Sequence, residues 1–459
     1  MNRRAIAGLA LGASAAALCA AVFAAPAPSL QLAQIGAKPI PPGYNFPTAT
    51  PTILGWVATS NTAAIRAHSW DIWAGMTANS GEVYQGAQLP IWETWYGSDD
   101  VFPSSGSSDT TTATLASKRR TLRAFIRPHQ FAHTKAGRAL ALGPPAARVV
   151  SFNKFSPEAA GFILKPQPGP GAKTYRYNSS TSLNALNNAW PTAVPPQHRA
   201  VNDFPDKALE TKPVFSTVSA AGLTPQPLWQ GPSASTNPTN PTPDTWTTCV
   251  LIDPTGTTSG IQPATPAQIA GANKVSGLAC KTYFYGALST FYSFKMSAAE
   301  AAAFNNAQGG SAKAGDFAVL VAMHVNSKEI PFWTWQTFYW QPGPDTPNGF
   351  PGSKAGQPAS LKAPWTNYAS CSNYDQTTKP HGTTMEVCFN PYLETSPGIP
   401  AGITSNCMSC HGTARVGKYD ENNPYPANYN AAIAFFTDPL YFNNGTTHTD
   451  FSWAVADAP

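Results

Sequence analysis

The stretch FAVLVAMHVNSKEIPFWTWQTFYW, residues 317–340, carries the strongest β-strand pattern in the chain. Apolar side chains alternate with smaller ones from Phe317 to Val325, and residues 330–340 form a second run that is rich in aromatic side chains. The polar residues 326–329 lie between the two runs, where a turn is needed. We therefore predict that this stretch folds as a β-hairpin.

Other local patterns predict short elements around the hairpin. Residues 61–76 repeat apolar side chains at spacings of three and four, which indicates a helix with one apolar face. Residues 156–158 and 297–300 carry N-cap signals, so we expect a helix to begin at each. Residues 86–96 have the aromatic and β-branched character of a strand.

The composition favours a loop-rich chain. Only 12% of the residues are charged, whereas the sequence holds 45 prolines and 35 glycines, which is untypical of a helical bundle. We predict an α+β fold, with a loop-rich, antiparallel β-containing body, short helices and a helical segment near the C-terminus. The expected regions are a signal peptide at 1–24, an extended arm at 25–52, an α+β region at 53–223, a Pro/Ser/Thr-rich loop at 224–248 and a β-rich region at 249–459.

The N-terminus has the pattern of a secretory signal peptide. Arg3 and Arg4 precede an uncharged Ala/Leu-rich run over residues 5–25, and the small-residue exit ends at Ala24. We predict cleavage after Ala24 and export to the periplasm. A membrane anchor is the alternative, but the run is rich in alanine rather than in leucine or isoleucine.

Partners of two classes are disfavoured by the rest of the sequence. The formal net charge is +5, and removal of Arg3 and Arg4 lowers it by two to +3, which is too weak to argue for nucleic acid. Beyond the N-terminal run, no stretch is long and apolar enough to span a bilayer, so we expect no stable membrane span.

The cysteines agree with export. Of seven, one leaves with the signal peptide and two belong to a motif near the C-terminus. The other four are an even set, suited to disulfides in an oxidising compartment. Pairing nearest neighbours predicts Cys249–Cys280 and Cys371–Cys388, which is one of three possible connectivities, and free thiols are the alternative.

Near the C-terminus stands Cys407-Met408-Ser409-Cys410-His411, a CxxCH motif. Two thiols one helical turn apart can both reach the vinyl groups on one porphyrin edge, and the imidazole after them can ligate iron. A zinc site would need a second pair of soft ligands with similar spacing, which the sequence lacks. A redox CxxC would not need His411. The motif therefore predicts one covalently bound haem c.

Residues 406–412, with Ala414 and Arg415 after them, resemble the haem segment of bacterial periplasmic monohaem c-type cytochromes. The resemblance implies thioether bonds to Cys407 and Cys410 and proximal iron ligation by His411. The order of an aromatic β-hairpin followed by a late CxxCH is also similar to that of the cytochrome P460 group, which would place aromatic strands against the haem.

The sixth iron ligand is left open by the sequence, because no methionine follows Met408. Met385 and His448 are the candidates, and the position could also be vacant. Each candidate has a structural alternative, since Met385 could be a core strand residue and His448 an exposed loop histidine.

Four further side chains are candidates for contact with the haem or its propionates. His68 lies on the apolar face of its expected helix, which favours a hydrogen-bonded core histidine. His324 alternates off the apolar face of its strand and could face the haem or solvent. Arg415 and Lys418 could pair with the haem propionates or remain solvated.

Two functions fit these features. The first is transfer of single electrons between the haem and a redox partner protein. The alternative is a haem enzyme whose open distal face oxidises a small-molecule substrate. Motifs of serine hydrolases, zinc proteases, P-loop proteins and dinucleotide-binding proteins are missing from the sequence.

Overall fold

The hairpin at residues 317–340 lies at the centre of the fold. In the computed structural model of the chain, β16 (Phe317–Ser327) pairs antiparallel with β17 (Thr334–Trp340), which confirms the prediction. The connection is wider than residues 326–329, because Ser327 still pairs with Thr334 and the chain turns over residues 328–333. Polar side chains of this turn are buried, with Lys328 5% and Glu329 0% exposed.

The structure describes most of the chain, and the predicted signal peptide lies outside the described residues. The described residues are 29–103, 111–126, 149–194, 198–343, 350, 353–375, 386–395, 402–404, 406–412, 414–416, 447–456 and 458. Helices, antiparallel strands and loops are all present, so the predicted α+β class is confirmed.

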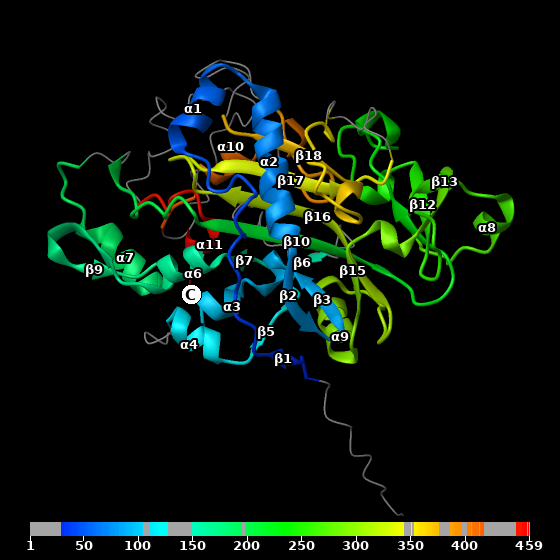
Figure 1. Ribbon diagram of the computed structural model, residues 1–459, viewed down its shortest axis with the longest axis horizontal. Helices are drawn as coiled ribbons and strands as arrows, with labels where there is room; N and C mark the ends of the chain where they lie inside the picture. Colours follow the sequence, from blue (N-terminus) through cyan, green and yellow to red (C-terminus); the bar gives the residue numbers. More distant parts are fainter. Residues whose placement is uncertain are drawn as a thin grey trace, which may run out of the picture.

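The main sheet is built around this hairpin (Figure 1). Its order is β18–β17–β16–β10–β7–β4, while β15 pairs with β16 and β6 pairs with β10, all antiparallel. Its other strands are β4 (Tyr96–Gly97), β6 (Val150–Ser151), β7 (Lys154–Phe155), β10 (Leu209–Val218), β15 (Ser293–Lys295) and β18 (Tyr368–Asn373). Because β10 pairs with β16, the predicted regions 53–223 and 249–459 share one sheet.

A second sheet, ordered β11–β12–β14–β13, lies beside the main one and combines antiparallel and parallel pairs. Its strands are β11 (Thr224–Pro227), β12 (Thr248–Asp253), β13 (Ile261–Pro263) and β14 (Thr282–Ala287). The predicted loop at 224–248 therefore begins with a strand, and its two tryptophans, Trp229 and Trp246, are buried with ring centroids 5.0 Å apart. Small paired strands complete the β-structure: β1 (Leu32–Ala33) with β5 (Arg120–Thr121), β2 (Asn79–Tyr84) with β3 (Ala87–Pro90), and β8 (Gln167–Pro168) with β9 (Thr174–Tyr175).

Short helices surround the sheets. They include α1 (Thr50–Ala58), α2 (Thr62–Thr77), α3 (Ser98–Val101), α4 (Thr112–Ser117), α6 (Pro157–Leu164), α7 (Ser180–Ala189), α8 (Pro266–Ala270), α9 (Ala298–Gln308), α10 (Cys407–His411) and α11 (Trp453–Ala456). The predicted helices at 61–76, 156 and 297 are confirmed as α2, α6 and α9. Asn61, Ser156 and Ser297 cap them by accepting backbone hydrogens three residues later. Among the described residues, no helix has the length and apolar character needed to cross a membrane.

The strand predicted at 86–96 is wrong as one element. After β3 the chain forms a 3-10 turn over Ile91–Thr94 before the short strand β4. Thr94 Oγ1 donates to the carbonyl of Ile91 at 2.7 Å, and the Glu93 carboxylate turns inward to a buried ion pair with Arg123. These inward polar contacts break the alternation that an extended strand would need.

Both predicted cysteine pairs form, Cys249–Cys280 and Cys371–Cys388, with Cα atoms 5.6 and 5.7 Å apart. The first joins the start of β12 to the segment before β14. The second joins β18 to residues 386–395, which lead toward the C-terminal motif.

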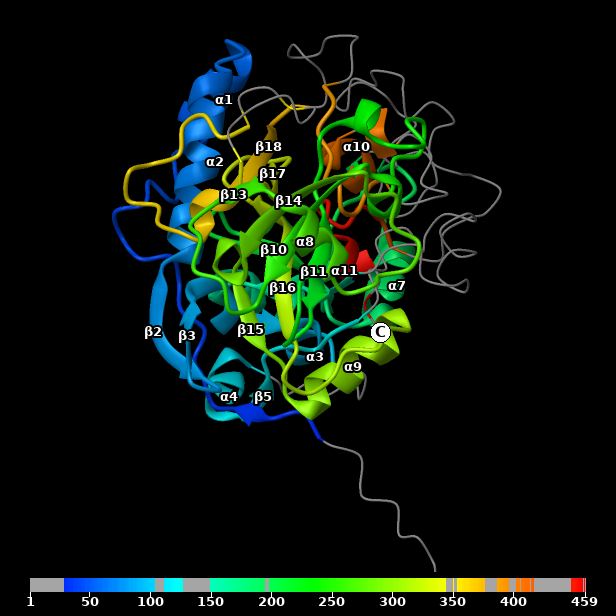
Figure 2. The ribbon, with the colours of Figure 1, turned by 90° about the vertical axis from the view of Figure 1, so that its right-hand side faces the viewer.

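The two faces of β17 pack on different parts of the molecule. Phe338 stacks on Trp73 of α2 with ring centroids 4.1 Å apart. Trp335 is three positions before Phe338 on the same strand, so its side chain lies on the opposite face. There it packs beside α10. Figure 2 shows α2 and α10 on opposite sides of β17 and β18. The hairpin therefore joins a core under α2 to a second core that contains α10.

Phe338→Ala should lower the free energy of unfolding by about 3–5 kcal/mol, because the ring is fully buried between Trp70 and Trp73. Chemical denaturation checks this against Val83→Ala, whose side chain is 55% exposed and should change stability by about 0.5 kcal/mol or less. Equal effects of the two substitutions would contradict a core centred on β17.

Candidate functional site

The CxxCH motif forms the short helix α10, so backbone positions 407 and 410 lie one turn apart. Met408 points into the second core and is 1% exposed. The amide of Gly412 donates to the carbonyl of Met408 at 2.8 Å and closes the last turn. Met408 is thus the residue that anchors the motif, while Cys407 and His411 are half-buried at its edge.

His411 is held in one orientation by two contacts. Its Nδ1 lies 2.8 Å from the carbonyl oxygen of Phe451, and its ring centroid lies 4.4 Å from that of Trp335. A carbonyl can only accept, so Nδ1 carries the hydrogen and the lone pair of the neutral ring is on Nε2. Metal-ligating histidines commonly have this arrangement, with one ring nitrogen donating to a carbonyl. The donor chemistry of His411 therefore fits an axial ligand of haem iron.

Trp335 forms a fixed wall for His411. It lies on β17, is 3% exposed, and its indole Nε1 donates to the carbonyl of Phe332 at 2.9 Å. This bond satisfies the only polar group of the ring, so the indole can remain buried in the second core. The aromatic strand of the hairpin thereby sets the position of the imidazole.

A C-terminal segment, residues 447–452, is hydrogen-bonded to the residues that follow α10. The amide of Val416 donates to the carbonyl of Thr447 at 2.8 Å, and that of Thr449 donates to Ala414 at 3.1 Å. On its other side, His448 exchanges backbone bonds with residues 199–201, at 2.7 and 2.8 Å. The segment therefore ties the residues after the motif to the body of the protein.

His448 is buried in this segment and is not an exposed loop histidine. It is 5% exposed, its Nε2 donates to the carbonyl of Gly412 at 3.1 Å, and its ring meets that of Phe451 edge-on. Burial, together with Arg415 and Lys328, lowers its pKa to about 4 against the opposing effect of the Gly412 bond, so the ring is neutral near pH 7. Because Nε2 serves Gly412, ligation of iron by that atom would require this bond to break.

The other candidates lie in different settings. His68 is 2% exposed and bonds Tyr374 at 2.7 Å and Glu329 at 3.1 Å, which confirms it as a hydrogen-bonded core histidine. His324 is half-buried and pairs with Glu394 at 3.0 Å. Arg415 is half-buried and forms a backbone bridge with His448. Met385 and Lys418 lie outside the described residues.

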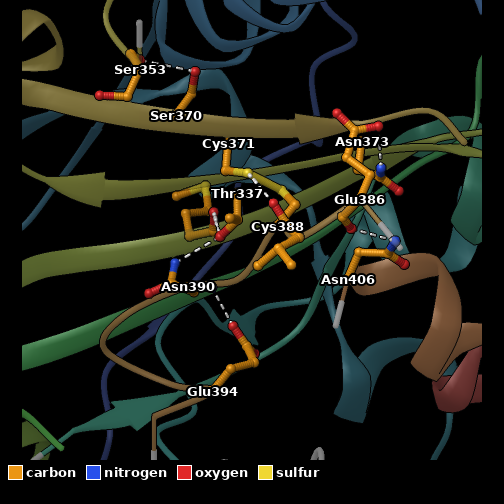
Figure 3. Close-up of a disulfide and its surroundings, with 12 residues drawn as sticks. Thr337, Ser353, Ser370, Cys371, Asn373, Glu386, Cys388, Asn390, Glu394 and Asn406 are labelled. Atoms are coloured by element: carbon orange, nitrogen blue, oxygen red, sulfur yellow. Dashed lines mark hydrogen bonds between the residues drawn. A yellow bond between two sulfur atoms is a disulfide. The ribbon is translucent and has the colours of Figure 1, made fainter. Parts of the chain in front are cut away.

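A polar cluster beside the motif was not foreseen from the sequence (Figure 3). Asn406, the residue before Cys407, donates to the carbonyl of Glu386 at 2.8 Å, and the Glu386 carboxylate accepts from Asn373 at 3.0 Å. Burial raises the pKa of Glu386 to about 7, while the Asn373 bond lowers it. Because Glu386 is two residues before Cys388, the Cys371–Cys388 disulfide fixes this cluster to β18.

Within the described part of the chain, no three His, Cys, Asp or Glu side chains gather as a site that could hold a metal ion by themselves. A haem makes no such demand on the protein, because the porphyrin supplies the equatorial nitrogens and the chain supplies only axial ligands. Comparisons with protein-family models, with curated proteins and with solved structures found no match for this chain.

His448→Ala should lower the free energy of unfolding by about 2–4 kcal/mol, since it removes a buried ring and leaves the Gly412 carbonyl without its donor. Thermal or chemical denaturation measures this, with the exposed His198→Ala as the matched control. A variant that keeps full stability but loses the low-spin haem spectrum would instead identify His448 as the sixth ligand.

Proposed function

We propose that this protein is an exported c-type cytochrome that binds one haem through Cys407 and Cys410 and transfers electrons in the periplasm. The observation that carries the proposal is the hydrogen bond from His411 Nδ1 to the Phe451 carbonyl, directly after a helical CxxC. That bond orients the ring and leaves its lone pair on Nε2, as an iron ligand requires.

The residues around His411 suit electron transfer. A haem bound there would supply an iron that changes between the ferrous and ferric states. Trp335, Met408 and Phe451, each 5% exposed or less, exclude water from the proximal side. A ring held by both a carbonyl and an indole keeps its position when the charge on the iron changes, so little rearrangement accompanies transfer.

The cysteines and the N-terminus support export. The Cys249–Cys280 and Cys371–Cys388 disulfides suit an oxidising compartment, and residues 1–24 have the pattern of a cleaved signal peptide. Covalent haem attachment at a CxxCH is compatible with the same compartment.

The expected partner is a redox protein that approaches the edge of the motif. Cys407 and His411 are half-buried, whereas the wall behind them is buried. Electrons would therefore enter and leave on the side of the thioether bonds, where a partner can come close. Oxidation of a small molecule at an open distal face is the competing function, and ligand binding distinguishes the two.

The double variant Cys407→Ser/Cys410→Ser should lose covalent haem completely, because no thioether can form. Haem staining of the denatured, exported protein measures this, with Ser409→Ala as the control that keeps both thiols and the imidazole. Staining that survives the double substitution would overturn the proposal.

The optical spectrum with and without carbon monoxide or cyanide separates electron transfer from small-molecule chemistry. An electron carrier should give a low-spin spectrum that these ligands leave unchanged, because both axial positions are held. A high-spin spectrum that shifts on addition of either ligand would contradict the carrier and support the haem enzyme.

A further inference from the structure

We propose that a buried ion pair between Lys328 and Asp450 positions the Phe451 carbonyl against His411 and thereby sets the reduction potential of the haem. The inference rests on the proposed function. It assigns positioning roles to two residues that do not touch the imidazole themselves and that belong to distant parts of the sequence.

The backbone at the acceptor carbonyl is in an unusual conformation. Asp450 has φ +49° and Phe451 has φ +65°, and both lie in the left-handed region that non-glycine residues rarely adopt. Such a conformation persists only where the surroundings enforce it, and it tends to occur at functional sites. Two successive residues of this kind turn the chain so that the Phe451 carbonyl faces His411 Nδ1 at 2.8 Å.

The enforcing contacts converge on the Asp450 carboxylate. Lys328 Nζ donates to Asp450 Oδ1 at 2.5 Å, and the backbone amide of Phe204 donates to Oδ2 at 2.9 Å. The same ammonium donates to the Pro331 carbonyl at 2.6 Å and to Asp203 at 3.1 Å. Lys328 is 5% and Asp450 3% exposed, so loss of Lys328 would leave the Asp450 carboxylate buried without a cation, whereas loss of Asp450 would leave Lys328 with only the exposed Asp203.

The residue after Phe451 is fixed as well. Ser452 donates through its amide to the Thr449 carbonyl at 3.0 Å and through its hydroxyl to Glu210 of β10 at 2.9 Å. Phe451 is thus held between Asp450, bound to the hairpin turn, and Ser452, bound to the neighbouring strand. These attachments on both sides restrict movement of its carbonyl.

The hydrogen bond at Nδ1 bears directly on the iron. A stronger bond makes the imidazole a better electron donor through Nε2, which stabilises the ferric state and lowers the reduction potential. A weaker or lost bond has the opposite effect. Any change that releases the Phe451 carbonyl should therefore raise the potential.

The test compares Lys328→Met with Asp450→Asn, because their direct charge effects are opposite. Loss of a cation near the haem should by itself lower the potential, and loss of an anion should raise it. Release of the Phe451 carbonyl should raise the potential in both. We expect both variants to increase the ferrous-to-ferric ratio at a fixed applied potential by several-fold.

The measurement is an equilibrium redox titration of the haem-loaded protein at pH 8. Burial raises the pKa of the Asp450 carboxyl to about 7 while Lys328 lowers it, so the carboxylate is ionised at that pH. Lys328→Arg keeps the charge and should stay near the wild-type potential. If Lys328→Met does not fold, Asp450→Asn still tests the proposal, and an unchanged potential in that variant would overturn it.

If the reduction potential shifts in opposite directions in Lys328→Met and Asp450→Asn, the effect is one of charge alone and the inference is overturned. Unchanged potentials in both variants would overturn it as well. A different result refutes the proposed function, namely a wild-type protein that carries no covalent haem. A stained, redox-active protein with unshifted variants would refute the positioning role alone.

Discussion

The antiparallel pairing of β16 with β17 is the interaction on which the rest of the structure depends. One face of β17 presents Phe338 to α2, and the other presents Trp335 to His411. The turn between the strands supplies Lys328, which donates to Asp450 in the C-terminal segment 447–452. A single hairpin thus builds the core, shapes one side of the candidate haem site and connects the two. Distortion of the hairpin would therefore affect folding and the candidate haem site together.

Local patterns were sufficient to predict the elements whose contacts are local. The hairpin follows from alternation, α9 from the capping box of Ser297 and Glu300, and the Cys371–Cys388 pair from short spacing. The strand at 86–96 was wrong because the inward turn of Glu93 depends on Arg123, and nothing in the local sequence indicates that partner.

The motif itself could be located from the sequence, but the residues that hold the segment around it in place could not. Lys328 stands in a polar tetrapeptide typical of an exposed turn, and its partner Asp450 is 122 residues away. For His448 the sequence leaves an exposed loop histidine and an iron ligand as alternatives, whereas burial beside Gly412 gives it a hydrogen-bonding role. Such roles depend on tertiary contacts, which leave no periodic pattern in the chain.

The central claim is that Cys407–His411 carries one covalently bound haem. Peptide mapping by mass spectrometry of the exported protein tests it most directly. We predict that the proteolytic peptide containing Cys407–His411 gains the mass of one haem, and that the Cys249–Cys280 and Cys371–Cys388 peptides are linked without it. A Cys407–His411 peptide without added mass, from cells that mature other c-type cytochromes, would contradict the account.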